Sequence, residues 1–289
     1  MIKLNLLENY TYEDVLNLCV EGITGNHALK RNILNERANF YPFKDQYQTA
    51  ASTSQLFTIP PLDTSHTNDP GVIGPLKKSE LEKLYTQYFA KDSKPARKVY
   101  DAIKNAAKES CPFCGGIGTP KNVGHFLPKS HFPQFAVLPL NLVPACRDCN
   151  MESKGHGFAT SEEEQVIHPY FDADHFFNEQ WVFAIYTPSV DVDETGFFEY
   201  FAQPLEAWSE VDKARVEKYF EDFDLATRYA TQAAKNLKAV LAQINRNTNK
   251  NVPVEEIVED LLEPVLDECD FINHWQYGMY LALIDYLNG

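Results

Sequence analysis

The chain has 289 residues, 44% of them hydrophobic, and a formal net charge of −15. This composition excludes a disordered chain, and the length allows one large domain or two to three small ones. The sequence contains no run of about eighteen apolar residues and no secretory signal pattern. We therefore expect a cytoplasmic protein that has no membrane partner.

Positive charge gathers in the middle of the chain. Residues 91–158 contain ten Lys or Arg and five Asp or Glu, so this segment carries +5 while the rest of the chain carries −20. A positive segment inside an acidic chain suits local contact with a polyanion such as a nucleic acid. For the lysines between residues 77 and 108 alone, the solvated face of a helix is the simpler interpretation.

The first 75 residues predict a helical part that ends in a linker. Thr11 and Asp14 form a capping-box pattern ahead of apolar positions on one helix face. A second helix is expected from about His27 to Asn39. Between Ser52 and Pro75 the chain is rich in Pro, Gly and small polar residues, which is typical of a loop.

Two helices are expected next. The first follows Ser79 and runs through Phe89, and the second covers about residues 95–108. Val99 and Ile103 give the second helix an apolar stripe that can pack against the segment that follows, with its lysines on the other side.

Two Cys-x-x-Cys pairs come after these helices. They consist of Cys111, Cys114, Cys146 and Cys149. Four thiolates in two such pairs suit tetrahedral zinc, and a zinc ion with four sulfur ligands has no open position for water, so we expect a structural site. Gly115 and Gly116 allow the first pair to turn back beneath the metal. Cys19 and Cys269 lie in apolar helical patterns and are expected in the core.

Between and just beyond the cysteine pairs, the sequence places polar residues suited to catalysis. A predicted strand carries His125, the entry to a second strand carries Asn141, and a helix after the last cysteine carries Asn150 and Lys154 one turn apart. A strand–strand–helix order would turn the histidine and both asparagines toward one cleft. Imidazole is the side chain that can accept a proton from water at neutral pH.

The remaining third of the chain predicts a hairpin and helices. Trp181–Tyr186 and Phe197–Phe201 are expected as two strands joined by a turn around residues 193–196. Ser209 begins a long helical pattern with regularly spaced apolar residues, and two further helices are expected before and after Pro264.

Residues 111–154 resemble the HNH nucleases of the ββα-metal type that carry zinc knuckles. The similarity rests on the stretches His-Phe-Leu-Pro-Lys-Ser, Asn-Leu-Val-Pro-Ala-Cys and Cys-Asn, and it covers about a sixth of the chain. It implies an α+β, mainly helical fold. A small, treble-clef-like zinc core would lie between helical N- and C-terminal parts, with a β-hairpin after the core. We expect three parts, at residues 1–75, 76–172 and 173–289.

The resemblance also implies a role for each polar residue. His125 matches the family's general base, Asn141 the residue that braces the loop holding that base, and Asn150 the ligand of a catalytic Mg²⁺ or Mn²⁺. Lys129 or Lys154 could contact a phosphate oxygen. The implied activity is metal-dependent endonuclease cleavage of DNA or RNA.

The surroundings of the motif suggest a partner. The helix before Cys111 and residues 168–172 are similar to stand-alone HNH proteins that work beside an ATPase in bacterial anti-phage systems such as Septu. This similarity implies an ATPase subunit as protein partner and a role in antiviral defence.

One position departs from the family pattern. Relatives usually have an acidic or histidine metal ligand just before the catalytic histidine, and this chain has Gly124. Activity would then be weak, depend on high Mg²⁺ or Mn²⁺, or be supported by a neighbouring carboxylate such as Asp148. The alternative is a catalytically silent zinc module that binds nucleic acid or a partner.

The other histidines near the motif have simpler interpretations. His168 is expected as a structural cap or packing residue, and His131 and His156 as surface loop residues with a smaller chance of touching phosphate.

Overall fold

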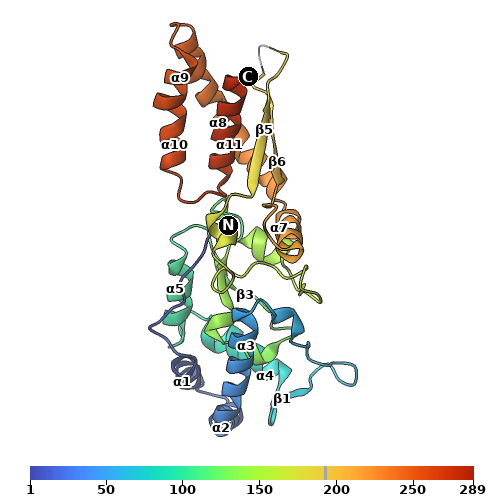
Figure 1. Ribbon diagram of the computed structural model, residues 1–289. Helices are drawn as coiled ribbons and strands as arrows, with labels where there is room; N and C mark the ends of the chain where they lie inside the picture. Colours follow the sequence, from blue (N-terminus) through green and yellow to red (C-terminus); the bar gives the residue numbers. More distant parts are fainter. Residues whose placement is uncertain (192–193) are drawn as a thin grey trace. The chain divides into compact units, whose positions relative to one another are not determined.

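The computed structural model describes residues 1–191 and 194–289, and at residues 152 and 153 it describes the backbone only. The chain forms two compact units. The N-terminal unit comprises Lys3–Pro112 and Gly118–Asp172, and the C-terminal unit comprises Met1–Ile2, Phe113–Ile117 and Ala173–Gly289. Helices dominate both units and the strands form small antiparallel sheets (Figure 1), so the predicted α+β, mainly helical class is confirmed.

The N-terminal unit begins with helices. Its helical segments, where η marks a short 3₁₀ or π-helical stretch, are α1 (Tyr12–Gly22), α2 (His27–Asn35), η1 (Arg37–Phe40), α3 (Tyr41–Ser52), η2 (Leu56–Thr58), α4 (Lys78–Lys83), η3 (Leu84–Phe89) and α5 (Arg97–Ala106). The capping box predicted for Thr11 and Asp14 is confirmed, because each side chain bonds the backbone N–H of the other residue. Cys19 is fully buried on α1, as expected.

Three details of this region differ from the prediction. Helix α2 ends at Asn35, four residues early, and continues as 3₁₀ helix. Helix α3 was not predicted from the sequence. The expected loop between Ser52 and Pro75 contains η2 and β1 (Gly71–Ile73), which pairs with β2 (Leu76–Lys77) across a turn at Gly74. Gly74 has a φ of +52°, a conformation that glycine adopts readily, and strands this short carry almost no periodic signal.

The centre of the N-terminal unit is a two-stranded sheet. Strand β3 (Asn122–His125) pairs antiparallel with β4 (Leu142–Ala145), and the loop between them contains η4 (Pro133–Phe135) and η5 (Pro139–Asn141). The π-helical segment η6 (Asp148–Ser153) follows β4. Helix α5 packs on both strands, with Val99 and Ile103 fully buried, which confirms its predicted apolar stripe.

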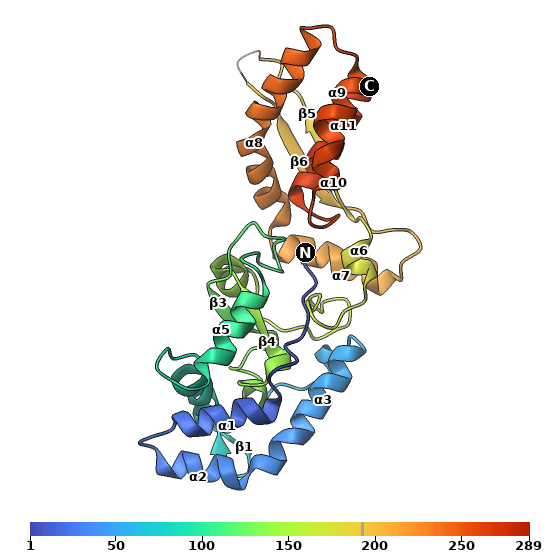
Figure 2. The same ribbon diagram turned by 90° about the vertical axis from the view of Figure 1, so that its left-hand side faces the viewer.

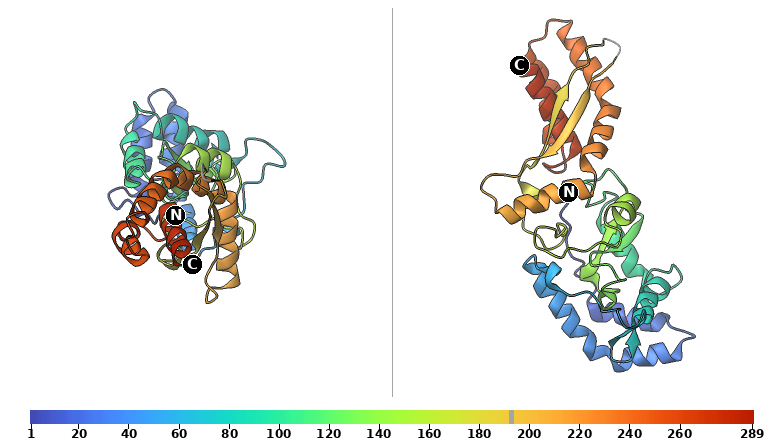
Figure 3. Two further views of the ribbon diagram at one scale, coloured as in Figure 1. Left: turned by 90° about the horizontal axis from the view of Figure 1, so that it is seen from above. Right: turned by 90° about the vertical axis from the view of Figure 1, so that its right-hand side faces the viewer.

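The C-terminal unit is a hairpin with helices along it. Its elements are α6 (His175–Asn178), β5 (Val182–Thr187), β6 (Phe197–Ala202), α7 (Glu210–Asp222), α8 (Leu225–Thr248), α9 (Val254–Ile257), η7 (Val258–Leu262), α10 (Glu263–Asp267) and α11 (Trp275–Asn288). The predicted strands pair in antiparallel register from Val182 opposite Ala202 to Thr187 opposite Phe197. Helix α11 packs on β5 and α8 on β6 (Figures 2 and 3). In the turn predicted at residues 193–196, Asp193 lies outside the described residues.

Two predictions for this unit are wrong in detail. The long helical pattern after Ser209 is divided into α7 and α8 at Asp224, whose φ of +46° is left-handed and interrupts the helix. Pro264 does not separate two helices. It lies in the first turn of α10, directly after the π-helical η7, where its missing N–H costs little, and the separation falls before α11. Cys269 lies in this connection and is half-buried, not in the core.

Candidate functional site

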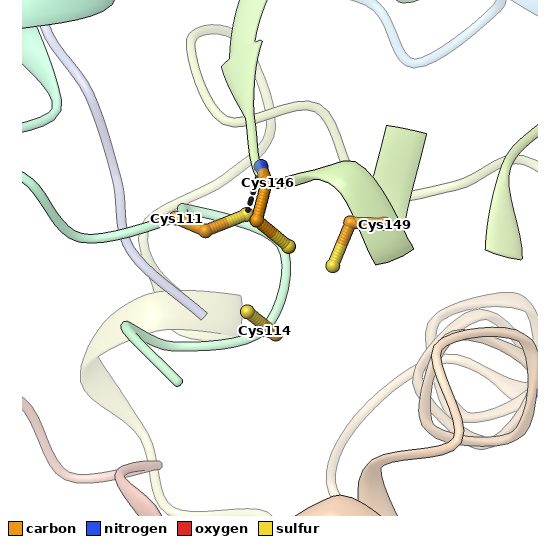
Figure 4. A group of neighbouring side chains, drawn as sticks. All are labelled: Cys111, Cys114, Cys146 and Cys149. Atoms are coloured by element: carbon orange, nitrogen blue, oxygen red, sulfur yellow. Dashed lines mark hydrogen bonds between the residues drawn. The ribbon is translucent and has the colours of Figure 1, made fainter. Parts of the chain in front are cut away.

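The paired cysteines form one cluster. All four residues are buried, and their sulfur atoms lie within 4.8 Å of one another. Figure 4 shows the four thiol groups converging, with the Cys146 backbone N–H donating to Cys111 Sγ at 3.3 Å. Gly115 and Gly116 turn the first pair with φ values of +59° and +82°. The cluster could therefore hold a metal ion such as zinc, with all four positions taken by sulfur.

The sheet and η6 bring Gly124 against Asn150. In β3, Gly124 lies opposite Val143, and His125 lies opposite Leu142. A Cβ atom added to Gly124 would lie 2.2 Å from Oδ1 of Asn150, far inside van der Waals contact. The space that a side chain at position 124 would need is thus filled by the carboxamide from η6. A side chain at position 124 would therefore require the Asn150 side chain to move.

These residues share an open cleft of about 460 Å³. Gly124, His125, Lys129 and Asn150 all line it, so the structure brings most of the predicted polar residues to one place. The described residues of the lining include no Asp or Glu, and Asp148 is not among them. Within the described lining, no carboxylate therefore balances the charge of Lys129.

His125 is held as a neutral base. Its Nε2 lies 2.9 Å from the carbonyl oxygen of Ala136. A carbonyl can only accept, so this bond selects the tautomer with the proton on Nε2 and leaves the Nδ1 lone pair to accept a proton. Burial lowers the pKa of His125 to about 3, and Lys129 and Lys154 act in the same direction. The ring is uncharged at neutral pH.

Two tyrosines hold the open edge of β3. The Tyr85 hydroxyl donates to the Val123 carbonyl, and the Val123 N–H donates to the Tyr100 hydroxyl oxygen at 3.2 Å. The Tyr85 ring also meets the His125 ring edge-on, with centroids 4.3 Å apart. The tyrosines thus satisfy the backbone beside Gly124 in place of a further strand. These two tyrosines were not predicted from the sequence as part of the site.

Asn141 is fully buried beneath the loop that joins the strands. Its Oδ1 accepts from the Leu127 N–H at 2.7 Å, and its Nδ2 donates to the carbonyls of Leu127 at 3.0 Å and Phe135 at 3.3 Å. It does not line the cleft. These bonds fix the loop that carries Ala136, the residue whose carbonyl binds the His125 ring.

The two predicted phosphate-binding lysines occupy different places. Lys129 lines the cleft, and its ammonium lies 5.7 Å from the centre of the Tyr85 ring. Lys154 is absent from the lining and donates to the carbonyls of His125, at 2.9 Å, and Phe126. Burial lowers the pKa of Lys154 to about 7. Lys154 therefore supports the backbone at the end of β3 in this structure.

The three other histidines near the motif are one core residue, His168, and two residues beside or in the cleft, His131 and His156. His168 is buried; its Nε2 bonds the Tyr47 hydroxyl at 3.1 Å, its Nδ1 accepts from the Tyr170 N–H at 3.2 Å, and its ring stacks on Phe126. Its predicted packing role is confirmed. His156 is exposed and lines the cleft, and His131 lies half-buried against Phe158.

The fold and the two sites define an α+β protein that combines a buried four-cysteine cluster with an open cleft lined by His125, Lys129 and Asn150. The chain is 39% identical over 285 residues to Protein ea31 of Escherichia phage lambda, and the alignment covers 94% of each chain. It therefore belongs to the same family as that phage protein. No family model matches the sequence, and no solved structure matches this one. Within residues 1–191 and 194–289, no helix combines the length and apolar composition needed to cross a bilayer.

Proposed function

We propose that this protein is an HNH endonuclease with a ββα-metal core and a structural zinc, which hydrolyses phosphodiester bonds of DNA or RNA. One observation carries the proposal. A neutral histidine with a fixed tautomer shares an open, positive cleft with Asn150, and both come from a strand–strand–helix arrangement beside two Cys-x-x-Cys pairs. That combination supplies a proton acceptor where a polyanion can bind.

In the proposed reaction, His125 is the general base. A water oxygen forms a bond to phosphorus as Nδ1 of His125 takes the water proton, the bond from phosphorus to the leaving sugar oxygen breaks, and that oxygen receives a proton from solvent. Asn141 keeps the loop in place, so that the Ala136 carbonyl holds the ring. Lys129 lines the same cleft and offers an ammonium to the phosphate backbone of the bound strand.

In this proposal, Asn150 is the protein ligand of a divalent ion. The Asn150 side-chain oxygen would hold Mg²⁺ or Mn²⁺ together with water and substrate phosphate, since hard cations prefer oxygen ligands and Mg²⁺ keeps several waters. When bound, such an ion offsets the charge that builds on the phosphate. Asn150 occupies the space beside Gly124. We therefore interpret Gly124 as the residue that makes room for the Asn150 side chain, and not as a position that has lost a metal ligand.

A cleavage assay tests the proposal. Supercoiled plasmid, single-stranded DNA and tRNA are each incubated with Mg²⁺ or Mn²⁺ and with the parent protein, His125→Ala or Asn150→Ala. We expect cleavage of at least one polymer by the parent and a loss of at least about 100-fold in His125→Ala, since general-base catalysis contributes on this scale. His66→Ala, which changes an exposed loop histidine, is the matched control and should cleave normally.

Two outcomes would contradict the proposal. Equal cleavage by the parent and His125→Ala would remove the histidine from the mechanism. No cleavage of any polymer with either ion would favour the silent alternative, a zinc-stabilised module that binds nucleic acid or a partner without cutting.

We further propose a protein partner, an ATPase subunit, and a role in antiviral defence. Residues 173–289 contain 22 Asp or Glu and eight Lys or Arg. A surface of this charge would repel a nucleic acid, so it is better suited to protein contacts. Expression together with the neighbouring genes, followed by size-exclusion chromatography and an ATPase assay, tests this. A monomer that is fully active alone would contradict it.

A further inference from the structure

Two loops form one wall of the cleft beside His125. One loop, residues 128–130, follows β3, and the other, residues 155–156, follows η6. Gly155 has a φ of +50°, and this left-handed turn directs the second loop toward the first. The loops meet through a hydrogen bond between Ser130 Oγ and His156 Nδ1 at 3.3 Å. This bond, with Lys129 against the Tyr85 ring, restricts three polar side chains before any ligand binds.

The wall carries positive charge without a carboxylate to balance it. Lys129 lies close enough to His125 to help lower the pKa of that ring. His131 follows the first loop, and its pKa is lowered by burial first and then by the charges of Lys78 and His156. Among the described residues, no Asp or Glu forms an ion pair with Lys129 or His156. An ammonium in a cleft whose described lining has no carboxylate favours an anionic ligand.

We propose that Lys129, Ser130 and His156 bind the backbone phosphate that flanks the scissile phosphate on one side. The inference rests on the proposed nuclease function, which places the scissile phosphate at His125 and Asn150. An ammonium, a hydroxyl and an imidazole together offer the donors that phosphate oxygens accept. The site fixes the path of one strand across the cleft and reads no base, so it serves DNA and RNA equally.

Binding is measured without turnover, in the His125→Ala protein. The ligands are fluorescein-labelled oligonucleotides of single-stranded DNA and RNA, and the readout is anisotropy over a range of salt concentrations. We expect Lys129→Ala and His156→Ala each to weaken binding several-fold. Lys129→Ala should also reduce the slope of log Kd against log salt by about one, because one phosphate contact is lost. Lys129→Arg should retain binding.

The controls change cations outside the cleft. Lys98→Ala removes an exposed lysine from α5, and His66→Ala an exposed loop histidine; neither should alter the affinity. Circular dichroism melts establish that each variant is folded. A chelator is avoided, since it would also remove a metal from the cysteines.

The results separate this site from the proposed function. Unchanged affinity and salt slope in both Lys129→Ala and His156→Ala would overturn the site, as would a complete absence of binding. If the parent cleaves through His125 while these variants bind normally, the site fails and the nuclease stands. If binding depends on the site but the parent never cleaves, the nuclease proposal fails and the site stands.

Discussion

The cysteine cluster and the His125 cleft come from the same stretch of sequence and are opposite in character. The cluster is enclosed, contains only thiols, and its sulfur atoms lie within 4.8 Å of one another. The cleft is open, has a volume of about 460 Å³, and is lined by imidazole, amide and ammonium groups. A metal ion with four sulfur ligands has no open position, so under the proposed function the cluster would support the structure and the cleft would hold the substrate.

If the cysteine cluster supports the structure, removal of one thiol should destabilise the fold as well as abolish the activity. We expect Cys146→Ser to lose its metal and its cooperative unfolding, since structural zinc sites contribute on the order of 10 kcal/mol in small zinc domains. Metal analysis and thermal melts measure both. Cys269→Ser is the matched control, because this half-buried cysteine lies outside the cluster. Full metal content and an unchanged melting temperature in Cys146→Ser would refute the structural role.

A methyl group at position 124 should damage the cleft and spare the cluster. In Gly124→Ala the added Cβ would meet Asn150 Oδ1 at 2.2 Å, so the asparagine must move. We expect the cleavage rate to fall roughly 10- to 100-fold, which corresponds to about 1.4–2.7 kcal/mol of barrier. Metal content should be unchanged. Gly157→Ala is the control, because its Cβ would have no atom nearer than 3.4 Å.

The same geometry makes a sharper prediction for an acidic residue at this position. Gly124→Asp alone should not raise activity, since its side chain displaces Asn150. The double variant Gly124→Asp with Asn150→Gly removes the collision and moves the oxygen ligand from η6 to β3. It should therefore cleave faster than Gly124→Asp in Mg²⁺. Higher activity in Gly124→Asp than in the parent would show instead that the glycine is a lost ligand.

The sequence predicted the elements that have strong local signals. The capped helix at Thr11 and the strands of the hairpin after Trp181 follow from side-chain chemistry and periodicity within a few residues. Helix α3 has a weaker pattern, and β1 and β2 are too short for any periodicity. The break at Asp224 depends on a left-handed residue that no spacing rule identifies.

The sequence predicted which residues make up the candidate site, but not which residues contact one another there. The motif placed His125 and Asn150 together, and both line one cleft. Tyr85 and Tyr100 both bond the backbone of Val123, although they lie 38 and 23 positions before it in the sequence. No local pattern encodes such contacts. The collision between a residue at position 124 and Asn150 likewise requires the packing of β3 against η6, which spacing alone does not give.

Asn141 should connect stability and activity within the N-terminal unit. Asn141→Ala leaves the buried N–H and carbonyl of Leu127 without their partner, each at a cost of about 1–3 kcal/mol, while the Phe135 carbonyl still accepts from the Leu138 N–H. We expect unfolding to become easier by roughly 3 kcal/mol in chemical denaturation, with retained metal. Asn236→Ala, an exposed asparagine on α8, should change the free energy of unfolding by less than about 0.5 kcal/mol. An unchanged stability in Asn141→Ala would show that the loop does not depend on this side chain.

The smallest expected effect is the contribution of His125 to the pH dependence of the free energy of unfolding. The native pKa of His125 is lowered to about 3 from an ordinary value of 6.5, so between these values the unfolded chain binds a proton that the native protein does not. The free energy of unfolding should therefore fall as the pH drops below about 6.5, and His125 should add no pH dependence above it. His125→Gln removes this contribution, so its stability should fall less steeply between pH 7 and 5 in denaturant titrations. Proton competition at the cysteines affects both proteins equally and cancels in the comparison. Parallel curves would mean that His125 keeps a nearly ordinary pKa in the native protein, so that burial does not lower the pKa of its ring.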